Sequence, residues 1–384
     1  MLSFWQNTKG RAYFLQLVLL LSIAALFWWL IGNTLDNLAE RNITTGFGFL
    51  DKETGFEVNF SLLAYDETSS FSRLLFVGLA NTALVSVIGI FFATLLGFTI
   101  GVMRLSSNWL VAKTATVYVE VLRNLPLLVQ ILFWYSAMLN LLPHPRQSYA
   151  LAEVVFLNKR GLYLPGFEAL PSFTLALSVF VLGMVIYFFM ARRDKAKRVA
   201  TGQKRLSRYF VIVGLVFAMF IVVGVYGIPF AFEYPQLKGF NFKGGISLTP
   251  EFVALALALI TYTAAFIAEI VRSGIQAVSK GQVEAAQSLG LTRLQSLRMV
   301  VIPQAMRVII PPLTSQYLNL TKNSSLAAAI AYPELVSVFA GTALNQTGQA
   351  IEILFITMSI YLGLSLLAAA LMNWYNARVK LVER

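Results

Sequence analysis

The sequence predicts an all-α polytopic membrane protein with about eight transmembrane helices. The chain has 384 residues, of which 58% are hydrophobic and only 12% are charged, whereas a soluble domain averages about 25% charged residues. Its mean hydropathy is +0.71, and long uncharged runs recur along it. Runs of about 20 apolar residues are long enough to cross a bilayer as helices. The chain is therefore expected to lie in a membrane.

The composition also argues against other classes of protein. A net charge of +12 could indicate a nucleic-acid partner, but the basic residues stand in short segments beside apolar runs, as the positive-inside bias of membrane proteins requires. The chain has no cysteine and a single histidine, His144, between two prolines. Thiolate metal sites are excluded, and we expect no metal or cofactor site in the chain.

The first apolar run predicts an uncleaved membrane-spanning helix. It covers residues 12–35, after Lys9 and Arg11, and its apolar centre is long for a signal peptide. No small-residue cleavage site follows it, and residues 36–73 are polar and acidic. Residues 1–73 are therefore expected to form a transmembrane helix followed by an acidic periplasmic segment.

Seven further apolar runs predict the remaining spans in order. The second run ends at Arg104 and is long enough for a tilted helix. In the third run Glu120 and Arg123 stand three residues apart and are expected to pair, as are Glu269 and Arg272 in the sixth. A proline-marked loop precedes the fourth run, and a basic stretch separates it from the fifth. The expected spans are 74–103, 117–141, 172–190, 209–230, 252–271, 305–330 and 353–373.

The distribution of charge predicts the orientation. An even number of crossings places both termini on one side, and that side carries most of the lysine and arginine, including the basic stretch at residues 192–208. The positive-inside rule then places both termini, the tail at 376–384 and the segment around Glu284 in the cytoplasm. The basic stretch is expected to anchor this topology rather than to bind lipid or protein.

The seventh span is unusual because it is short. Only the fourteen residues 308–321 separate Arg307 from Lys322, and a full crossing needs about 20. Either Lys322 lies at membrane depth facing protein or water, or the segment is re-entrant. An even number of crossings favours the first alternative.

The charged segment between the sixth and seventh spans predicts two short helices separated by a glycine. Ser279 and Gln282 fit a capping box, and the helix that they open should end at Gly290, because glycine is favoured just past a helix C-terminus. Thr292 and Gln295 fit a second capping box, whose helix should stop at Pro303.

This segment could bind another protein. Alanines 285 and 286 at an exposed surface would let another backbone approach closely, and Glu284 offers a carboxylate to a basic partner. The alternative is an amphipathic loop on the membrane surface, and spacing alone leaves both possibilities open.

The motif resembles the EAA motif of ABC importer permease subunits. Glu284, Ala285 and Ala286, with Gly290 and Pro303 after them, carry the resemblance. The polar amino-acid branch of that family is matched by further segments. These are 123–130, 272–276, 280–282, 303–305, 311–313, 322–327 and 332–335.

The resemblance implies an architecture and partners. It implies a type I importer permease domain over residues 74–375, with an insertion at about 142–249 that carries two extra spans, as in the enlarged subunits of general L-amino-acid or glutamate/glutamine/aspartate/asparagine uptake systems. It places the chain in the bacterial inner membrane, with a cytoplasmic ATPase dimer, a second permease subunit (identical or different), a periplasmic binding protein and an amino-acid substrate as partners. The EAA segment would be the coupling helix that sits in the ATPase.

The chain lacks the phosphate-binding loop of an ATPase. The pattern G-x-x-x-x-G-K-[ST] does not occur in it. We therefore expect a non-catalytic subunit, with ATP and Mg²⁺ bound by the partner.

Polar residues at membrane depth are candidates for the substrate path, since burying ionisable groups there is costly. Lys322 could receive a substrate carboxylate, with Asn319, Asn323 and Ser324 near it in sequence. The alternative is a snorkelling lysine or a partner for Glu334 or Glu352. Gln130 is a weaker candidate, because such residues more often bond neighbouring helices.

A secondary transporter driven by an ion gradient is the alternative function. It would usually show an internal repeat, and residues 74–190 and 209–373 show no convincing one.

Overall fold

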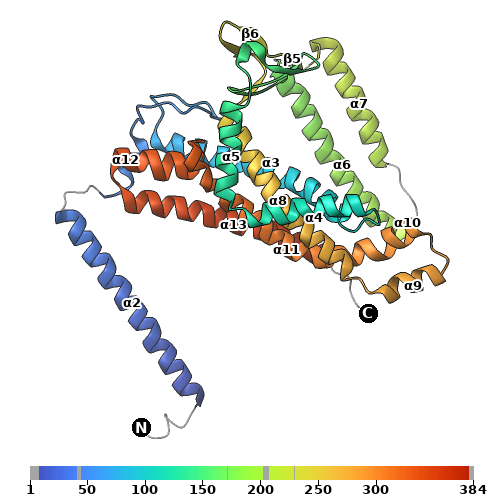
Figure 1. Ribbon diagram of the computed structural model, residues 1–384, viewed down its shortest axis with the longest axis horizontal. Coiled ribbons are helices and arrows are strands. Elements are labelled where there is room, and N and C mark those ends of the chain that lie inside the picture. The colour runs from blue at the N-terminus through green and yellow to red at the C-terminus, as the bar shows by residue number, and fades with distance from the viewer. Residues whose placement is uncertain (1–7, 41–44, 171, 202–206, 229, 380–384) are drawn as a thin grey trace. The chain divides into compact units, whose positions relative to one another are not determined.

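The computed structural model describes residues 8–40, 45–170, 172–201, 207–228 and 230–379 (Figure 1). The chain divides into two compact units, one formed by Met1–Trp134 with Ala254–Arg384 and the other by Tyr135–Val253. Residues 202–206, in the predicted basic loop, and 380–384, in the predicted tail, lie outside the described residues.

The fold is helical, as the sequence predicts. The long helices are α2 (Thr8–Glu40), α3 (Phe71–Met103), α4 (Trp109–Asn124), α5 (Leu127–Asn140), α6 (Phe173–Thr201), α7 (Ser207–Tyr226), α8 (Pro250–Gln276), α11 (Ile302–Asn323) and α13 (Ala350–Val379). Six helices of the described part are long and apolar enough to cross a membrane, or seven if a bent pair counts as one span. This count does not confirm the predicted number of about eight, and α11, which covers most of the seventh predicted span, is not among the six.

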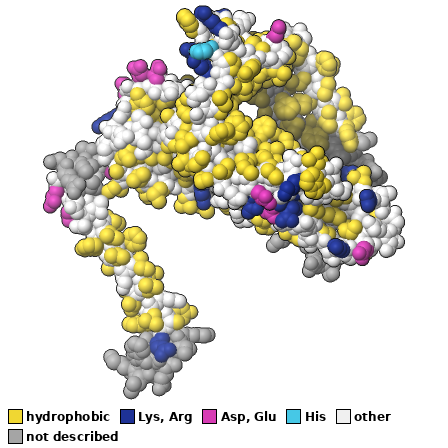
Figure 2. All heavy atoms as spheres, in the orientation of Figure 1, with side chains coloured by type: hydrophobic (Ala, Val, Ile, Leu, Met, Phe, Trp, Pro, Cys, Tyr) yellow, Lys and Arg dark blue, Asp and Glu magenta, His cyan; other side chains and the backbone are white. Residues whose placement is uncertain are grey.

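Much of the helical surface is apolar and open. None of the apolar window of α2 is buried, and only 6% of the corresponding windows of α6 and α7 is buried. Figure 2 shows hydrophobic side chains spread over much of the visible surface. Such surfaces are stable in lipid, where helices satisfy their own backbone groups.

The third predicted span is not one continuous helix, which corrects the sequence analysis. It is the pair α4 and α5, bent by 105°. Leu125 between them is extended, with φ −94° and ψ 131°, because the ring of Pro126 disfavours the helical conformation in the preceding residue. The axes of α4 and α5 therefore run in different directions.

Short β-strands that the sequence analysis did not anticipate occur in the second unit. One sheet has the strand order β1-β2-β3-β8 and is antiparallel throughout, and β4–β5 and β6–β7 are two-stranded. Each strand has three or four residues, too few for a clear alternating pattern. The strands are Tyr149–Leu151, Val155–Asn158, Gly161–Leu164, Gly166–Ala169, Phe230–Glu233, Gln236–Lys238, Asn241–Lys243 and Ile246–Leu248.

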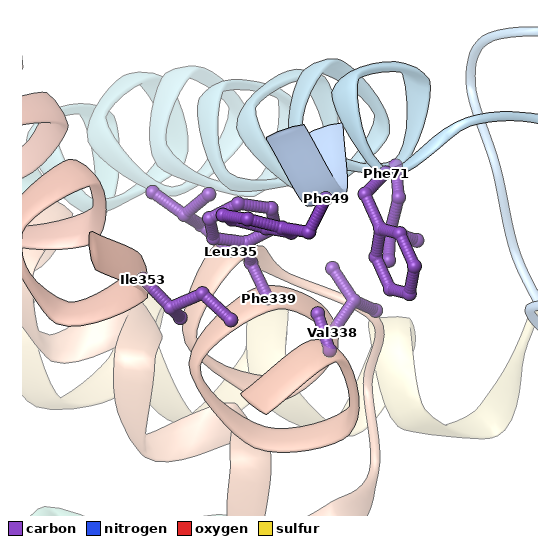
Figure 3. Packing of buried hydrophobic residues seen from close by; sticks show 8 residues of the cluster. Phe49, Phe71, Leu335, Val338, Phe339 and Ile353 are labelled. Atoms are coloured by element: carbon purple, nitrogen blue, oxygen red, sulfur yellow. The ribbon is translucent and has the colours of Figure 1, made fainter. Parts of the chain in front are cut away.

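Within the first unit, a buried cluster packs the acidic segment against residues 335–353. Phe49 and Phe71 pack with Phe339, and Leu335, Val338 and Ile353 complete the cluster (Figure 3). The helical segments η5 (Val336–Ala343) and α12 (Leu344–Thr347), which follow the 3-10 helix η4 (Ser324–Ile330), supply part of it.

Hydrogen bonds from Thr68 and Ser69 hold the carboxylate of Asp66 and lower its pKa. Residues 49–70 also hydrogen-bond the first turn of α3, so they form an ordered cap on that helix.

Candidate functional site

The turn at Gly290 has the geometry that the sequence predicts. Gly290 follows α9 (Lys280–Ser288) and has φ +75°. Its N–H donates to the carbonyl of Gln287 at 2.9 Å, and the N–H of Leu291 donates to the carbonyl of Ala286 at 3.2 Å. This pair of bonds is a Schellman motif, which satisfies carbonyls at the end of a helix and requires the left-handed conformation that glycine adopts without strain.

The two predicted capping boxes have different outcomes. Thr292 forms its box with Gln295 at the start of α10 (Arg293–Ser296), which confirms that prediction. Ser279 is the N-cap of α9 but makes no side-chain capping bond, so that box is wrong. The amide of Gln282 instead accepts a hydrogen bond from Gln304 on α11 at 3.4 Å, because this tertiary contact competes for the side chain.

The prediction that Pro303 ends the second helix is also wrong. The helical path continues from α10 through a π-helical stretch, η3 (Leu297–Val301), into α11. Pro303 occupies the first turn of α11, where its missing N–H costs little. The wide π turn, in which the N–H of Ile302 reaches the carbonyl of Leu297, accommodates the irregular start of α11.

The exposed surface of this segment combines a carboxylate, an alanine and two leucines. Glu284 and Ala285 are exposed, and Leu289 and Leu294 are 82% and 73% exposed. Ala286 is only 3% exposed, so it packs inside the segment and not at the surface where the sequence analysis places it. We call the exposed residues Glu284, Ala285, Leu289, Gly290 and Leu294 the α9–α10 knuckle.

Two of the five predicted path residues line a cavity. Asn319 and Asn323 on α11 border a space of about 250 Å³. The other residues that line it lie on α11 and α8. The sequence analysis did not identify these residues, although they recur at helical spacing. These residues are Gln316, Tyr262, Thr263 and Phe266.

The other three predicted path residues lie elsewhere. Lys322 is exposed, and Ser324 is fully buried, with its hydroxyl donating to the carbonyl of Thr321 at 2.7 Å. The carboxylates suggested as partners for Lys322 are engaged by other groups. Glu334 accepts hydrogen bonds from Val336, Ser337 and Tyr361, and Glu352 accepts one from Gly46.

Gln130 has a structural role at the bend between α4 and α5. Its side-chain amide donates to the carbonyls of Leu122 and Leu125 at 3.0 and 3.1 Å. Leu122 would normally bond the N–H four residues later, but that residue is Pro126, which has none. Gln130 is 5% exposed, so its buried amide satisfies the Leu122 carbonyl that the proline leaves without a partner, together with the Leu125 carbonyl at the bend.

Replacing Gln130 with leucine is expected to lower stability more than substrate affinity. The substitution leaves two carbonyls without their donor, at about 1–3 kcal/mol each. Thermal unfolding of the purified subunit in detergent measures the first effect, and the KM for uptake measures the second. A raised KM with an unchanged unfolding temperature would instead indicate that Gln130 contacts the substrate.

An ion-pair cluster joins α3, α4 and α8. Glu269 contacts Arg272 at 2.5 Å, which confirms that predicted pair, and also Arg104. Arg123 lies 3.7 Å from the same carboxylate, so its predicted pairing with Glu120 is wrong. Arg123 also lies over the ring of Phe266, 5.0 Å from its centroid, so partners on α8 replace the local one.

The sequence has relatives along nearly its whole length. Residues 172–381 match the family described as "Binding-protein-dependent transport system inner membrane component". The general L-amino acid transport system permease protein AapQ of Rhizobium johnstonii is 48% identical, with 98% of this chain and 94% of that protein covered. The glutamate/glutamine/aspartate/asparagine transport system permease protein BztB of Rhodobacter capsulatus is 41% identical, with 98% and 96% covered.

A third relative agrees with these. YhdX of Escherichia coli (strain K12), named as an amino-acid ABC transporter permease protein, is 49% identical over 98% of this chain and 96% of its own length. With the helical fold and the ordered α9–α10 knuckle, these matches show that the chain belongs to the family of binding-protein-dependent transport system inner membrane components, the membrane permeases of ABC transporters.

Proposed function

We propose that this permease imports polar or acidic L-amino acids across the bacterial inner membrane, and that a separate ATPase subunit supplies the energy through the α9–α10 knuckle. The observation that carries the proposal is the surface of the knuckle. Exposed leucines beside a carboxylate and a small alanine are unusual on a segment that does not span the membrane, and they are typical of a protein interface. Both termini are proposed to be cytoplasmic.

The mechanism follows from the rigidity of the turn. The Schellman bonds at Gly290 fix α9 relative to α10, and Gln304 links α9 to α11. Movement of the bound ATPase would therefore pass to α11, whose residues Asn319 and Asn323 line the cavity. An ATP-dependent change in the partner can shift the permease between inward- and outward-facing states only if the partner binds these states differently.

The nature of the substrate is inferred from the relatives. Two of them are named for general L-amino acids and for glutamate, glutamine, aspartate and asparagine. The cavity that Asn319 and Asn323 border has amide and hydroxyl groups in its walls, which can hydrogen-bond polar side chains. A second permease subunit and a periplasmic binding protein complete the proposed complex.

Reconstitution tests this proposal. The chain, purified with its partner subunits in proteoliposomes, should take up labelled glutamate or glutamine only when ATP and binding protein are present. Uptake by the chain without an ATPase, driven by a proton or sodium gradient, would favour the secondary transporter instead. The family assignment favours the importer.

Lys322 provides a narrower prediction about the substrate. Lys322→Met is expected to lower uptake of aspartate and glutamate about tenfold, the effect of losing about 1.4 kcal/mol of charge-assisted binding, and to leave uptake of glutamine within about twofold. Assembly measured by gel filtration should be unchanged, because the side chain is exposed. Equal uptake of acidic substrates by both proteins would make Lys322 a surface residue without a role in transport.

A further inference from the structure

The cluster around Glu269 contains more positive than negative charge. The guanidinium groups of Arg104, Arg123 and Arg272 all lie within ion-pair distance of this one carboxylate. Glu120 is exposed on α4, and within the described part of the chain Glu269 is the acid that pairs with these three arginines. Two positive charges therefore remain without a paired anion.

Helix ends reduce this surplus without removing it. Arg104 is the C-cap residue of α3, and Arg123 lies in the last turn of α4. The C-terminus of a helix carries roughly half a negative charge, so two such ends offset about one unit. The cluster still has net positive charge, and a charge that is partly removed from water requires a counter-ion or hydrogen-bond acceptors.

Several donors in the cluster also lack acceptors. The Nε atoms of Arg104 and Arg272 are buried and have no hydrogen-bond partner. Each guanidinium carries five N–H groups, and beyond the contacts with Glu269 the recorded acceptor for the cluster is the side chain of Gln276, at 2.8 Å from Arg272 Nη1. An oxyanion with several acceptor oxygens is the chemical group that matches such a set of donors.

The cluster is partly exposed. The side chain of Arg104 is 11% exposed and that of Arg272 is 29% exposed, whereas Arg123 reaches 38%. A basic cluster that is only partly exposed near helix ends can accept an anionic lipid headgroup.

We propose that Arg104, Arg123 and Arg272 form a binding site for the phosphate oxyanion of an anionic phospholipid, in the leaflet on the side of the α9–α10 knuckle. The phosphate oxygens accept hydrogen bonds from the partly exposed guanidinium groups and neutralise the remaining charge. Because Gln276 ends α8 and α9 begins at Lys280, the bound lipid would hold together the three helices at the base of the knuckle. This site goes beyond the proposed transport function.

Lipid binding by the complete transporter complex tests the proposal. The delipidated complex is titrated with nanodiscs or vesicles of phosphatidylglycerol or of phosphatidylcholine, and bound lipid is counted by native mass spectrometry. The wild type should bind phosphatidylglycerol in preference to phosphatidylcholine. Arg123→Gln should weaken phosphatidylglycerol binding about fivefold, as expected for the loss of one basic contact with an anionic membrane.

Matched variants separate a site from general surface charge. Lys113→Gln removes one exposed positive charge from the same helix and should change binding less than twofold, while Glu269→Gln, which removes the cluster's carboxylate, should maintain or strengthen it. Arg123→Lys keeps the positive charge and should retain most of the phosphatidylglycerol binding. This variant tests the proposal even if Arg123→Gln folds poorly.

Three results would overturn the assignment. One is equal loss of phosphatidylglycerol in Arg123→Gln and Lys113→Gln, and another is equal binding of both lipids by the wild type. The third is displacement of the lipid by millimolar inorganic phosphate, which would make a free anion the ligand. Because the readout is lipid binding, these results do not depend on whether the transported substrate is an amino acid.

Discussion

Gly290→Val is expected to abolish most ATP-driven uptake while the subunit still inserts in the membrane. Gly290 has φ +75°, a conformation that costs a β-branched residue on the order of 1–3 kcal/mol. Valine would release the Schellman bonds to Gln287 and Ala286 and change the direction of the exposed Leu289. We expect uptake to fall at least about tenfold, because a free-energy cost of about 1.4 kcal/mol corresponds to a factor of ten. ATP hydrolysis should continue but should no longer drive transport.

Two controls isolate the backbone conformation as the cause. Gly290→Asn should keep most activity, because asparagine tolerates the left-handed region. Gly281→Val alters another glycine of α9, where φ is not positive and a Cβ would meet only the Ser279 hydroxyl at 3.7 Å, and it should leave transport nearly normal. Coupled transport at wild-type levels in Gly290→Val would show that the turn is not needed for coupling.

Asn81→Ala is expected to cause the largest loss of stability. Asn81 is fully buried on α3. Its amide donates to the carbonyls of Phe60 at 3.1 Å and Pro333 at 2.8 Å, and its carbonyl accepts from the N–H of Leu62 at 3.2 Å. Alanine leaves three backbone groups without a partner at about 1–3 kcal/mol each, so the free energy of unfolding should fall by roughly 3–9 kcal/mol.

Thermal unfolding in detergent and the yield of inserted protein measure this effect. Thr99→Ala provides the control, because Thr99 is exposed on the same helix and bonds only the carbonyl of Leu95 within that helix; its unfolding should change by less than about 0.5 kcal/mol. If Asn81→Ala unfolded at the same temperature as the wild type, the hydrogen bonds of the Asn81 side chain would not contribute to stability.

Local chemistry explains what the sequence could predict. The left-handed residue at Gly290 and the capping box at Thr292 depend on a few neighbouring residues, and both appear in the structure. The long apolar helices also follow from composition alone. The pair Glu269–Arg272 forms because both residues stand on one continuous helix.

Tertiary contacts explain what the sequence could not predict. Arg123 forms an ion pair with Glu269, which is more than a hundred residues away in the chain, and not with the nearby Glu120. Ser279 makes no capping bond while Gln282 contacts Gln304. The signal at Pro126 was present in the sequence, since a proline inside an apolar run indicates a possible break, but its consequence for Gln130 depends on the three-dimensional path of α4 and α5.

Site-directed cross-linking at Ala285 tests the central claim most directly. The natural chain has no cysteine, so Ala285→Cys introduces a single reactive thiol at an exposed position of the α9–α10 knuckle. In the assembled transporter this thiol should cross-link to the ATPase subunit, with a yield that changes on addition of ATP, and it should be protected from a membrane-impermeant thiol reagent added outside intact cells. Labelling from outside, or cross-linking to no other subunit, would contradict the account.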